Sequence, residues 1–520
     1  MNRRDIIRGA GQLAILAGLS ARPVWGAELP KGLFALGVAS GDPWPDGFVI
    51  WTRLAPKPAE PGSGMPMASV PVRWEVAEDE RFARIVRQGE ALARPELGHS
   101  VHVEVDGLRP ARRYWYRFVA GSEASPAGSA KSAPAAGAAV DRLRIGVAGC
   151  QHYEGGLFTA YKHLAAEDDL DAIFHYGDYI YEHSPTRGCP KEGKQPACGR
   201  LHDSDEIYSI DDYRRRYALY KGDADLQAAH RAAAFLPTWD DHEIENNWAG
   251  EWDENGTPPE LFVLRRAMAM QAWYENMPVR RAQIPAIGRV RMFRRLDYGN
   301  LLRIHLLDTR QYRTDQRCGP GKESKPCRAA SDTGPSEIIG REQEAWLGEG
   351  LGGGSRWNLI AQQVMVMPYT YPEARAAGRA NMDSWSGYPE ARARLTRAIG
   401  ERKLTNVVVA TGDVHKHHAG VVPSREGALD SAPVATEYVC TSISSGGDGA
   451  DFPEGWDKVP GDNPHAPYVS DRRGYQVFDI GPREWRTEVV GVDKVSAPDG
   501  ARRTLARFVT VPEKPGAVKA

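Results

Sequence analysis

The chain has 520 residues, enough for two or three domains of about 150 residues each. Lys and Arg number 66 and Asp and Glu 68, and this near-neutral balance of −2 argues against nucleic acid as the main partner. Hydrophobic residues make up 42% and charged residues 26%, which excludes a disordered chain. Because no apolar run of about 20 residues follows the first thirty positions, we expect no transmembrane segment in the mature protein.

The first residues predict an export signal. Arg3-Arg4 precedes Ile6-Ile7, an apolar stretch follows over residues 9–21, and Gly26-Ala27 ends it. A basic start, a short apolar middle and a small-residue end are typical of a secretory signal, and paired arginines are typical of the twin-arginine class. We predict a twin-arginine signal peptide over residues 1–27, the twin-arginine translocase as the partner during export, and a periplasmic or secreted protein. The alternative is an ordinary first helix with a basic end.

The next part of the chain has the pattern of an all-β domain. Short alternating runs predict strands at residues 48–52, 70–76 and 101–105. Residues 108–117, which include Tyr114, resemble the strand-corner motif of fibronectin-type modules. A linker rich in Ala, Gly, Ser and Pro over residues 121–139 marks its end. We predict an immunoglobulin- or fibronectin-like β-sandwich over residues 30–138.

Beyond this linker, buried-looking runs alternate with helical stretches. The predicted strands cover residues 143–148, 171–175, 234–239, 301–307, 357–360 and 407–410. The predicted helices cover residues 158–166 and 211–234. Alternation of this kind predicts an α/β domain, which we place at residues 142–512.

Side chains that can bind metal ions follow four of these predicted strands. They are Cys150, then Asp178 with Tyr181, then Asp241 with His242, and finally Asp413 with His415. In open α/β sheets, ligands bind beyond the carboxyl ends of the strands. We therefore expect these side chains to converge.

Each of these signals also has an ordinary structural explanation when it is taken alone. A Gly-Asp after a strand is usually a turn, Cys150 can be a small buried hydrophobe, and His415 can lie on the surface. Asp-His-Glu at residues 241–243 can begin a helix, and the zinc-protease pattern fails because Asn246 stands where a second histidine is needed. Together, however, these explanations require four unrelated turns to select metal-binding residues.

The charge of the cluster favours bound cations. With Cys150 and Tyr181 deprotonated and Asp178, Asp241 and Asp413 ionised, it carries five negative charges. Desolvated like charges do not coexist unpaired, so cations totalling about +5 are expected. Thiolate, phenolate and imidazole suit iron, whereas carboxylates suit a hard divalent ion such as calcium. A further divalent ion would leave surplus positive charge and attract an anionic substrate, for which a phosphate ester is the natural candidate.

The ordered set of motifs resembles the calcineurin-like metallophosphatases, and Gly177-Asp178-x-x-Tyr181 is close to the motif of purple acid phosphatases. Cys150 in the first motif, Trp239-Asp240-Asp241-His242-Glu243 and Gly412-Asp413-Val414-His415 resemble the PhoD family of alkaline phosphatases and phosphodiesterases. The resemblance covers nearly the whole chain. It implies a metallophosphatase α/β/β/α sandwich after the N-terminal β-sandwich.

The resemblance also implies one Fe³⁺ and one or two Ca²⁺ ions. It places four residues around iron: Cys150, Asp178, Tyr181 and His415. Asp178 also bridges to calcium, which Asp241 and Asp413 hold as well. Two positions depart from the family pattern: Gly149 stands where Ser or Ala precedes the Cys, and Ser386 stands where a second Asp is expected. The number of calcium ions therefore stays open.

The predicted function is an exported metal-dependent phosphoester hydrolase, an alkaline phosphatase of PhoD type, in which metal-bound hydroxide attacks the phosphate in line. His242 is the candidate for contacting the substrate or protonating the leaving group. The expected substrate is a phosphate mono- or diester of a small molecule or a lipid. The alternatives are a phospholipase D-like phosphodiesterase and a non-catalytic metal-containing binding protein.

Cysteine usage agrees with export. Cys189 with Cys198 and Cys318 with Cys327 form two pairs, each nine residues apart in a loop. We predict a disulfide in each pair, as expected in an oxidising compartment. A zinc site built from all four is the alternative, although the C-x₂-C spacing that it would use is absent.

Overall fold

The computed structural model describes residues 29–520 with gaps at 190, 193–194, 197, 287, 317–335, 353 and 372–380. The predicted signal peptide over residues 1–27 and the predicted Cys318–Cys327 disulfide therefore lie outside the described residues. None of the helices in the described ranges combines the length and the apolar character that a membrane crossing needs.

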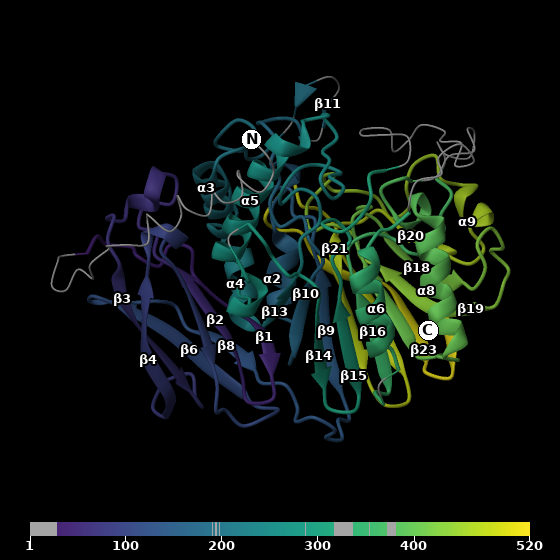
Figure 1. Cartoon of the computed structure of the whole chain (residues 1–520), viewed down its shortest axis with the longest axis horizontal. Coiled ribbons are helices and arrows are strands. Elements are labelled where there is room, and N and C mark those ends of the chain that lie inside the picture. Colours follow the sequence, from purple (N-terminus) through teal and green to yellow (C-terminus); the bar gives the residue numbers. More distant parts are fainter. Residues whose placement is uncertain are drawn as a thin grey trace.

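Two large β-sheets lie face to face in the body of the molecule (Figure 1). The first has ten strands in the order β24 (Lys514–Lys519), β23 (Arg502–Val511), β22 (Trp485–Val492), β21 (Gly474–Ile480), β9 (Leu143–Ala148), β10 (Ala172–His175), β13 (Phe235–Pro237), β1 (Val38–Trp44), β2 (Gly47–Arg53) and β5 (Ser100–Val105). The second has seven strands in the order β14 (Arg294–Tyr298), β15 (Leu302–Leu306), β16 (Trp357–Ala361), β17 (Val407–Thr411), β19 (Pro433–Val439), β18 (His417–Pro423) and β20 (Tyr468–Ser470).

Helices cover the outer face of each sheet. The ten-stranded sheet carries α2 (Thr159–Ala165), α3 (Ile210–Lys221), α4 (Ala224–Ala232) and α5 (Pro259–Asn276), and the seven-stranded sheet carries α6 (Gly340–Gly350) and α8 (Pro389–Glu401). A short helix, α9 (Val459–Asp462), follows near the C-terminal strands. Ser209 and Asp212 form a capping box that starts α3, and the Asp223 side chain caps α4. The result is the α/β/β/α arrangement that the family resemblance implies.

The apolar runs of the sequence form the centre of both sheets. β9, β10, β13, β15, β16 and β17 each coincide with a predicted strand to within about a residue or two. Their side chains are buried on both faces, because one face meets the other sheet and the other face meets helices. Ile145, Phe174, Leu302 and Val408, for example, share the core between the two sheets.

The N-terminal part, purple in Figure 1, is a β-sandwich. One of its sheets contains β4 (Ile85–Ala93), β3 (Val70–Ala77), β6 (Arg113–Ala120) and β7 (Glu123–Ala124), and β8 (Gly128–Lys131) also pairs with β6. The second sheet of the sandwich is formed by β1, β2 and β5. Tyr114, Tyr116 and Phe118 alternate into its core, and the Tyr114 hydroxyl accepts the Arg109 N–H at 2.9 Å. The predicted strand corner is thereby confirmed.

The sandwich shares a sheet with the rest of the molecule. β1 pairs in parallel with β13, so β1–β2–β5 extends the ten-stranded sheet. We call the contact of β2 and β5 with α3 and α5 the seam. There the Trp51 indole donates to the Glu275 carbonyl at 2.9 Å, and Arg53 donates to the Arg214 carbonyl at 3.1 Å. The linker predicted over residues 121–139 is wrong in extent, because β7 and β8 of the sandwich lie within it. The two parts of the chain are joined in space by the hydrogen bonds of the seam.

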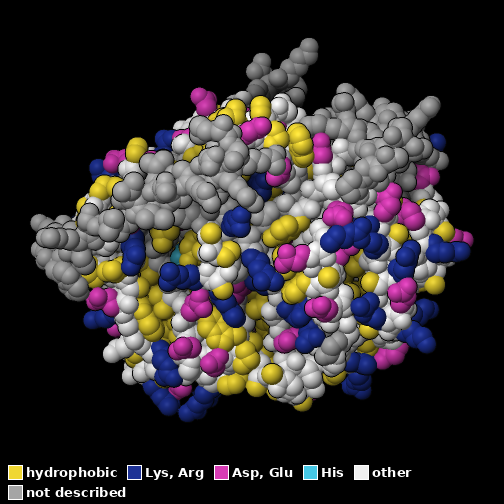
Figure 2. Space-filling model, in the orientation of Figure 1, with side chains coloured by type: hydrophobic (Ala, Val, Ile, Leu, Met, Phe, Trp, Pro, Cys, Tyr) yellow, Lys and Arg dark blue, Asp and Glu magenta, His cyan; other side chains and the backbone are white. Residues whose placement is uncertain are grey.

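A disulfide links Cys189 and Cys198, as predicted, and encloses a small hairpin of β11 (Lys191–Glu192) and β12 (Gln195–Pro196). The remaining described cysteines, Cys150 and Cys440, are free and buried. Lys and Arg side chains are interspersed with Asp and Glu side chains over the face seen in Figure 2.

Candidate metal centre

Loops from both sheets meet at the carboxyl ends of four strands. Cys150 follows β9, Asp178 follows β10, Asp241 follows β13, and Asp413 follows β17. The first two loops are joined directly, because the Cys150 N–H donates to the Gly177 carbonyl at 3.0 Å. Since β9, β10 and β13 belong to the ten-stranded sheet and β17 to the other, the site forms where the two sheets adjoin.

The backbone is strained at four of the predicted metal ligands. The φ angle is 50° at Cys150, 55° at Asp178, 69° at Asp413 and 55° at His415. Non-glycine residues adopt this left-handed region rarely, and holding one there costs of order 1–3 kcal/mol. Strain of this kind clusters at active sites and ligand clamps, where the surrounding structure enforces it. Four of the predicted ligands share this conformation, which is consistent with a functional site at these strand ends.

Tyr176 explains why a glycine precedes two of these ligands. A Cβ at Gly149 or at Gly412 would lie within 3.0 Å of the Tyr176 ring, a distance that real Cβ atoms do not tolerate. The Tyr176 hydroxyl donates to the Thr441 carbonyl at 2.6 Å and so holds the ring in place. Gly149, which departs from the family pattern, is thus required by its packing against Tyr176.

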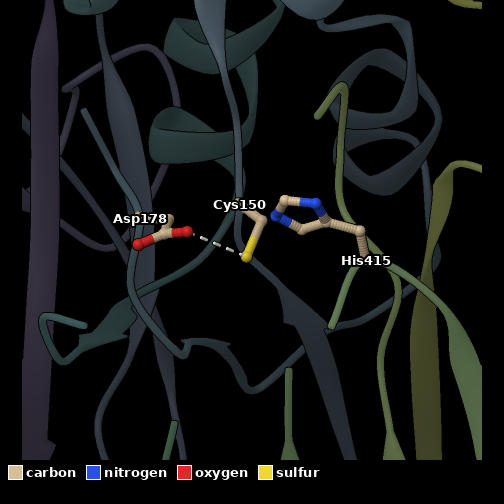
Figure 3. Close-up of side chains that lie close together, drawn as sticks. All are labelled: Cys150, Asp178 and His415. Carbon is tan, nitrogen blue, oxygen red and sulfur yellow. Dashed lines mark hydrogen bonds between the residues drawn. The ribbon is translucent and has the colours of Figure 1, made fainter. Parts of the chain in front are cut away.

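Cys150, Asp178, Tyr181 and His415 form one side of the centre, which we call the sulfur side. The Cys150 Sγ lies 3.3 Å from Asp178 Oδ2, and the Tyr181 hydroxyl donates to the same oxygen at 2.8 Å. His415 Nε2 lies 3.3 Å from the Tyr181 hydroxyl. Figure 3 shows Asp178 and His415 on opposite sides of Cys150, with the imidazole pointing toward it. The structure therefore brings the four predicted iron ligands together.

Without a bound cation, burial disfavours the charged forms of the side chains on the sulfur side. It raises the pKa of Cys150 well above the usual value, and the Asp178 carboxylate raises it further. The same two causes raise the pKa of Tyr181. Burial also raises the pKa of Asp178, and it lowers the pKa of His415 to about 3, which leaves a neutral imidazole. A cation placed among these groups would favour the deprotonated forms that bind metals.

Asp241 and Asp413 form the other side, which we call the carboxylate side. Arg310 Nη2 lies 3.6 Å from Asp241 Oδ1 and 3.7 Å from Asp413 Oδ1, so the two predicted calcium ligands flank one guanidinium. Ligand atoms of Asp241, Asp178 and His242 lie within 4.8 Å of one another, which connects the two sides. Burial raises the pKa of Asp413, whereas Arg310 and His242 hold the pKa of Asp241 below its usual value despite its burial.

His242 lies between Glu182 and Tyr181. Its Nδ1 is 2.7 Å from Glu182 Oε2, and its ring stacks on the Tyr181 ring with 4.0 Å between centroids. Burial by itself lowers the pKa of His242, but the carboxylates of Glu182 and Asp241 raise it well above the usual value. His242 in turn holds the pKa of the buried Glu182 at about 2. The pair is therefore an imidazolium and a carboxylate, with Nδ1 fixed by Glu182.

The segment around Ser386 contributes a different residue from the one expected. Ser386 Oγ accepts a hydrogen bond from Arg392 at 3.1 Å. The carboxylate of this segment that reaches the centre is Asp383, which pairs with Arg310 at 2.7 Å and with Arg313 at 2.8 Å. Asp383 therefore supplies acidic charge beside the carboxylate side.

Several residues of the centre are absent from the sequence-based predictions. Arg310 lies four residues after β15, so the strand-end rule that selects Asp413 could have found it. Glu182 directly follows Tyr181 and could have been found as a partner for His242. Ser445 has no such signal: it accepts or donates a hydrogen bond with the Tyr181 hydroxyl at 2.8 Å, across 264 positions of sequence.

The donor set fits metal cations. Within the centre, four buried carboxylate oxygens have no hydrogen-bond partner among the described residues: Asp178 Oδ1, Asp241 Oδ1, Asp240 Oδ2 and Asp383 Oδ2. Unpaired buried oxygens are costly and rare, because each has lost its water. The partners of Asp178 Oδ2 are a thiol and a phenol, which become metal ligands when they lose their protons. Cations would thus satisfy both the unpaired oxygens and the excess negative charge.

Fold and site together define a class of protein. Two stacked sheets flanked by helices, with thiol, phenol, carboxylate and imidazole donors at the carboxyl ends of their strands, are the arrangement of a metallophosphatase-type phosphoester hydrolase.

Comparisons with known proteins give the family. The model of the PhoD-like phosphatase family matches residues 145–489, and the model of its N-terminal domain matches residues 20–134. Alkaline phosphatase D of Bacillus subtilis (strain 168) is 44% identical over 99% of this chain and 88% of its own length. The chain therefore belongs to the PhoD-like phosphatase family and is a phosphoester hydrolase of that type.

Solved structures confirm the predicted fold class. A structure of PhoD matches with a TM-score of 0.88 and 44% identity, over 96% of this chain and 93% of that one. The purple acid phosphatase PPD1 from yellow lupin seeds matches with a TM-score of 0.56 and 14% identity, over 91% of this chain and 73% of that one. The second match concerns the fold alone.

Proposed function

We propose that this protein is an exported alkaline phosphatase that hydrolyses phosphate esters by in-line attack of water at a centre of bound cations. One observation carries the proposal. Loops from two sheets place a thiol, a phenol, an imidazole and three carboxylates together, with more negative charge than the neighbouring cations balance. Bound metal ions would balance this charge and would stabilise the deprotonated forms of the thiol and the phenol.

The two sides of the centre suit different ions. Thiolate, phenolate and imidazole on the sulfur side suit ferric iron, which Cys150, Tyr181 and His415 would hold together with Asp178. Carboxylates suit calcium, which Asp241 and Asp413 would hold, with Asp178 shared between the ions. When bound, the cations neutralise the phosphate and lower the pKa of water.

His242 is the proposed general acid. Glu182 fixes its Nδ1 at 2.7 Å and favours the imidazolium, so Nε2 carries a proton on the side of the ring that faces away from Glu182. His242 also belongs to the group whose ligand atoms adjoin Asp178 and Asp241. From this position it protonates the oxygen of the leaving group as the ester bond breaks.

Tyr181→Phe tests the ligand assignment. A phenolate bound to ferric iron gives a visible charge-transfer band, so the purified full chain should be purple or brown and contain iron. The variant should lose this band and at least tenfold in kcat/KM toward a chromogenic phosphoester. Tyr208→Phe, at a tyrosine that is 52% exposed, should change neither.

Two results would contradict this proposal in different ways. A colourless, iron-free and fully active protein would refute the iron assignment. A protein loaded with iron and calcium that hydrolyses neither a monoester nor a diester would refute the activity. We propose small-molecule or lipid phosphate esters as substrates, and relative rates on a monoester and a diester with the same leaving group decide between the two ester classes.

We also propose export by the twin-arginine route to the periplasm or the medium. Arg3-Arg4 supports this route, and the Cys189–Cys198 disulfide supports an oxidising destination. Replacing both arginines by lysine should retain the activity in the cytoplasm of the producing cell. Unchanged export of that variant would refute the route.

A further inference from the structure

Arg310 is a buried cation enclosed by carboxylates. Its side chain is fully buried, its Nε lies 2.5 Å from Asp240 Oδ1, and its Nη1 lies 2.7 Å from Asp383 Oδ1. Its carbonyl accepts the Gly250 N–H at 3.0 Å, which fixes the backbone as well. Because three of its atoms are held in this way, the position of the third nitrogen, Nη2, is determined.

That nitrogen is not used by any hydrogen bond within the described residues. It lies 3.6 Å from Asp241 Oδ1 and 3.7 Å from Asp413 Oδ1, beyond hydrogen-bonding distance of both. Both carboxylates are therefore close enough to interact with the charge of Arg310. Asp241 Oδ2 accepts the Asn247 N–H at 2.8 Å, while Asp241 Oδ1 has no hydrogen-bond partner among the described residues and stays free to bind another cation. Asp383 also pairs with Arg313, at 2.8 Å. The negative charge of Asp383 is therefore shared between two arginines and does not fully neutralise Arg310.

We propose that Arg310 is an internal cation that weakens the binding of divalent ions by Asp241 and Asp413 while holding their loops in place. The inference rests on the proposed function, which assigns these two carboxylates to a divalent ion. A guanidinium stays protonated at any pH that a folded protein tolerates, so this charge is permanent. Arg310 lies after β15, Asp241 after β13 and Asp413 after β17, so one side chain links three loops. The loops can thus assemble before an ion arrives, and the ion is held loosely enough to exchange.

Calcium titration tests the sign of this effect. Calcium-depleted full chain is titrated with Ca²⁺ by calorimetry, and bound calcium is counted by elemental analysis. Arg310→Gln should bind Ca²⁺ at least tenfold more tightly, or bind one more ion per chain, because a repelling charge is lost. Asp383→Asn should bind Ca²⁺ at least tenfold more weakly, because it frees the charge of Arg310.

The Arg310→Gln variant separates this role from a structural one. If Arg310 only held the loops together, both substitutions would weaken calcium binding. Arg53→Gln is the matched control, because Arg53 is a buried arginine of the seam and should leave the calcium affinity unchanged. Equal or weaker calcium binding by folded Arg310→Gln would overturn the proposal.

Two further measurements complete the test. If Arg310→Gln is unfolded without calcium by circular dichroism, the proposal requires added Ca²⁺ to restore the folded signal, and a failure to restore it overturns the proposal. Phosphoester hydrolysis by the untreated wild-type protein is measured in parallel. Its absence would contradict the proposed function, whereas unchanged calcium affinity in Arg310→Gln would contradict only the role of Arg310.

Discussion

The metal centre and the seam both bury ionised side chains, but they neutralise charge in different ways. In the seam, Arg53 donates four hydrogen bonds: to the carbonyls of Gly98 and Arg214 and to the side chains of Asn276 and Ser63. In the centre, Asp178 and Asp241 each keep one oxygen without a partner in the described structure. The hydrogen bonds of Arg53 are thus satisfied within the seam, whereas the centre lacks positive charge.

This difference separates a structural use of buried charge from a functional one. A buried ion with all its hydrogen bonds made stabilises the contact it lies in, or at least costs little. A buried ion with unpaired oxygens and a strained backbone lowers stability, and a protein retains it where a ligand binds. The two regions should therefore respond in opposite ways to substitution.

The largest effect is expected from Asp178→Asn. Asp178 lies between the two sides of the centre, so its loss should remove bound iron and reduce kcat/KM at least about 100-fold. In metal-free protein, the same change should leave the free energy of unfolding unchanged or raise it, because burying Asn requires neither an unpaired charge nor the uptake of a proton that burial imposes on Asp178. Kinetics, iron analysis and urea unfolding measure these quantities, and Asp106→Asn on the exposed surface of the sandwich is the control. A large loss of stability in metal-free Asp178→Asn would contradict the comparison.

Arg53→Met should give the opposite pattern. It leaves several buried acceptors of the seam unpaired, so the free energy of unfolding should fall by about 3 kcal/mol. The variant should keep kcat/KM within about twofold at a temperature where it is folded, because Arg53 does not contact the centre. Arg81→Met, at an exposed arginine, should change neither quantity. Loss of activity without loss of stability in Arg53→Met would show that the seam acts on the site.

Glu182→Gln should have a smaller effect that depends on pH. The Glu182 carboxylate raises the pKa of His242, so its removal lowers that pKa, and the imidazolium deprotonates at lower pH. If His242 is the general acid, the alkaline limb of the kcat profile should move down by at least about one pH unit. Glu206→Gln, at a carboxylate that pairs with Arg265 at 3.2 Å, is the matched control. An equal loss of kcat at every pH would mean that Glu182 only supports the loop.

The smallest effect concerns Lys221, the exception within the seam. Its Nζ has no hydrogen-bond partner in the described residues and lies 4.1 Å from the centroid of the Trp51 ring. Burial lowers the pKa of Lys221 well below 10.5, the value in the unfolded chain. Between the lowered pKa and 10.5, folding releases a proton, so the free energy of unfolding increases as the pH rises through this window. Relative to Lys221→Met, the wild type should gain about 1.4 kcal/mol per pH unit in that window.

Urea unfolding at two alkaline pH values measures this slope. The Lys221→Met variant should be the more stable protein at the lower pH, and the difference should narrow at the higher pH. For the control Lys162→Met, at an exposed lysine of α2, the free energy of unfolding should change with pH as it does in the wild type. If the free energies of unfolding of the wild type and of Lys221→Met changed equally with pH, the buried amine would be charged in the folded state, which would contradict this prediction.

The central strands could be predicted because each is a short apolar run bounded by polar turns. β9, for example, covers residues 143–148 in both the sequence pattern and the structure. The metal-binding candidates could be predicted for a related reason: the carboxyl ends of parallel strands adjoin, so polar residues placed there share one site. Cys150, Asp178 and His415 follow this rule. The disulfide between Cys189 and Cys198 was equally predictable from local sequence, since its members are nine positions apart.

What the sequence could not provide were contacts between residues with no local relation. The sandwich has its own alternating strands, but its sheet joins the ten-stranded sheet through β1 and β13, which only tertiary packing arranges. Local patterns determined the strands, the order of the motifs and the chemical types of the ligands, because each depends on neighbours along the chain. The enclosure of Arg310 by Asp240, Asp383 and the two ligand carboxylates was decided by the tertiary structure. Its physical reason is that buried charges select partners by distance in space, and the loops that bear them are distant in sequence.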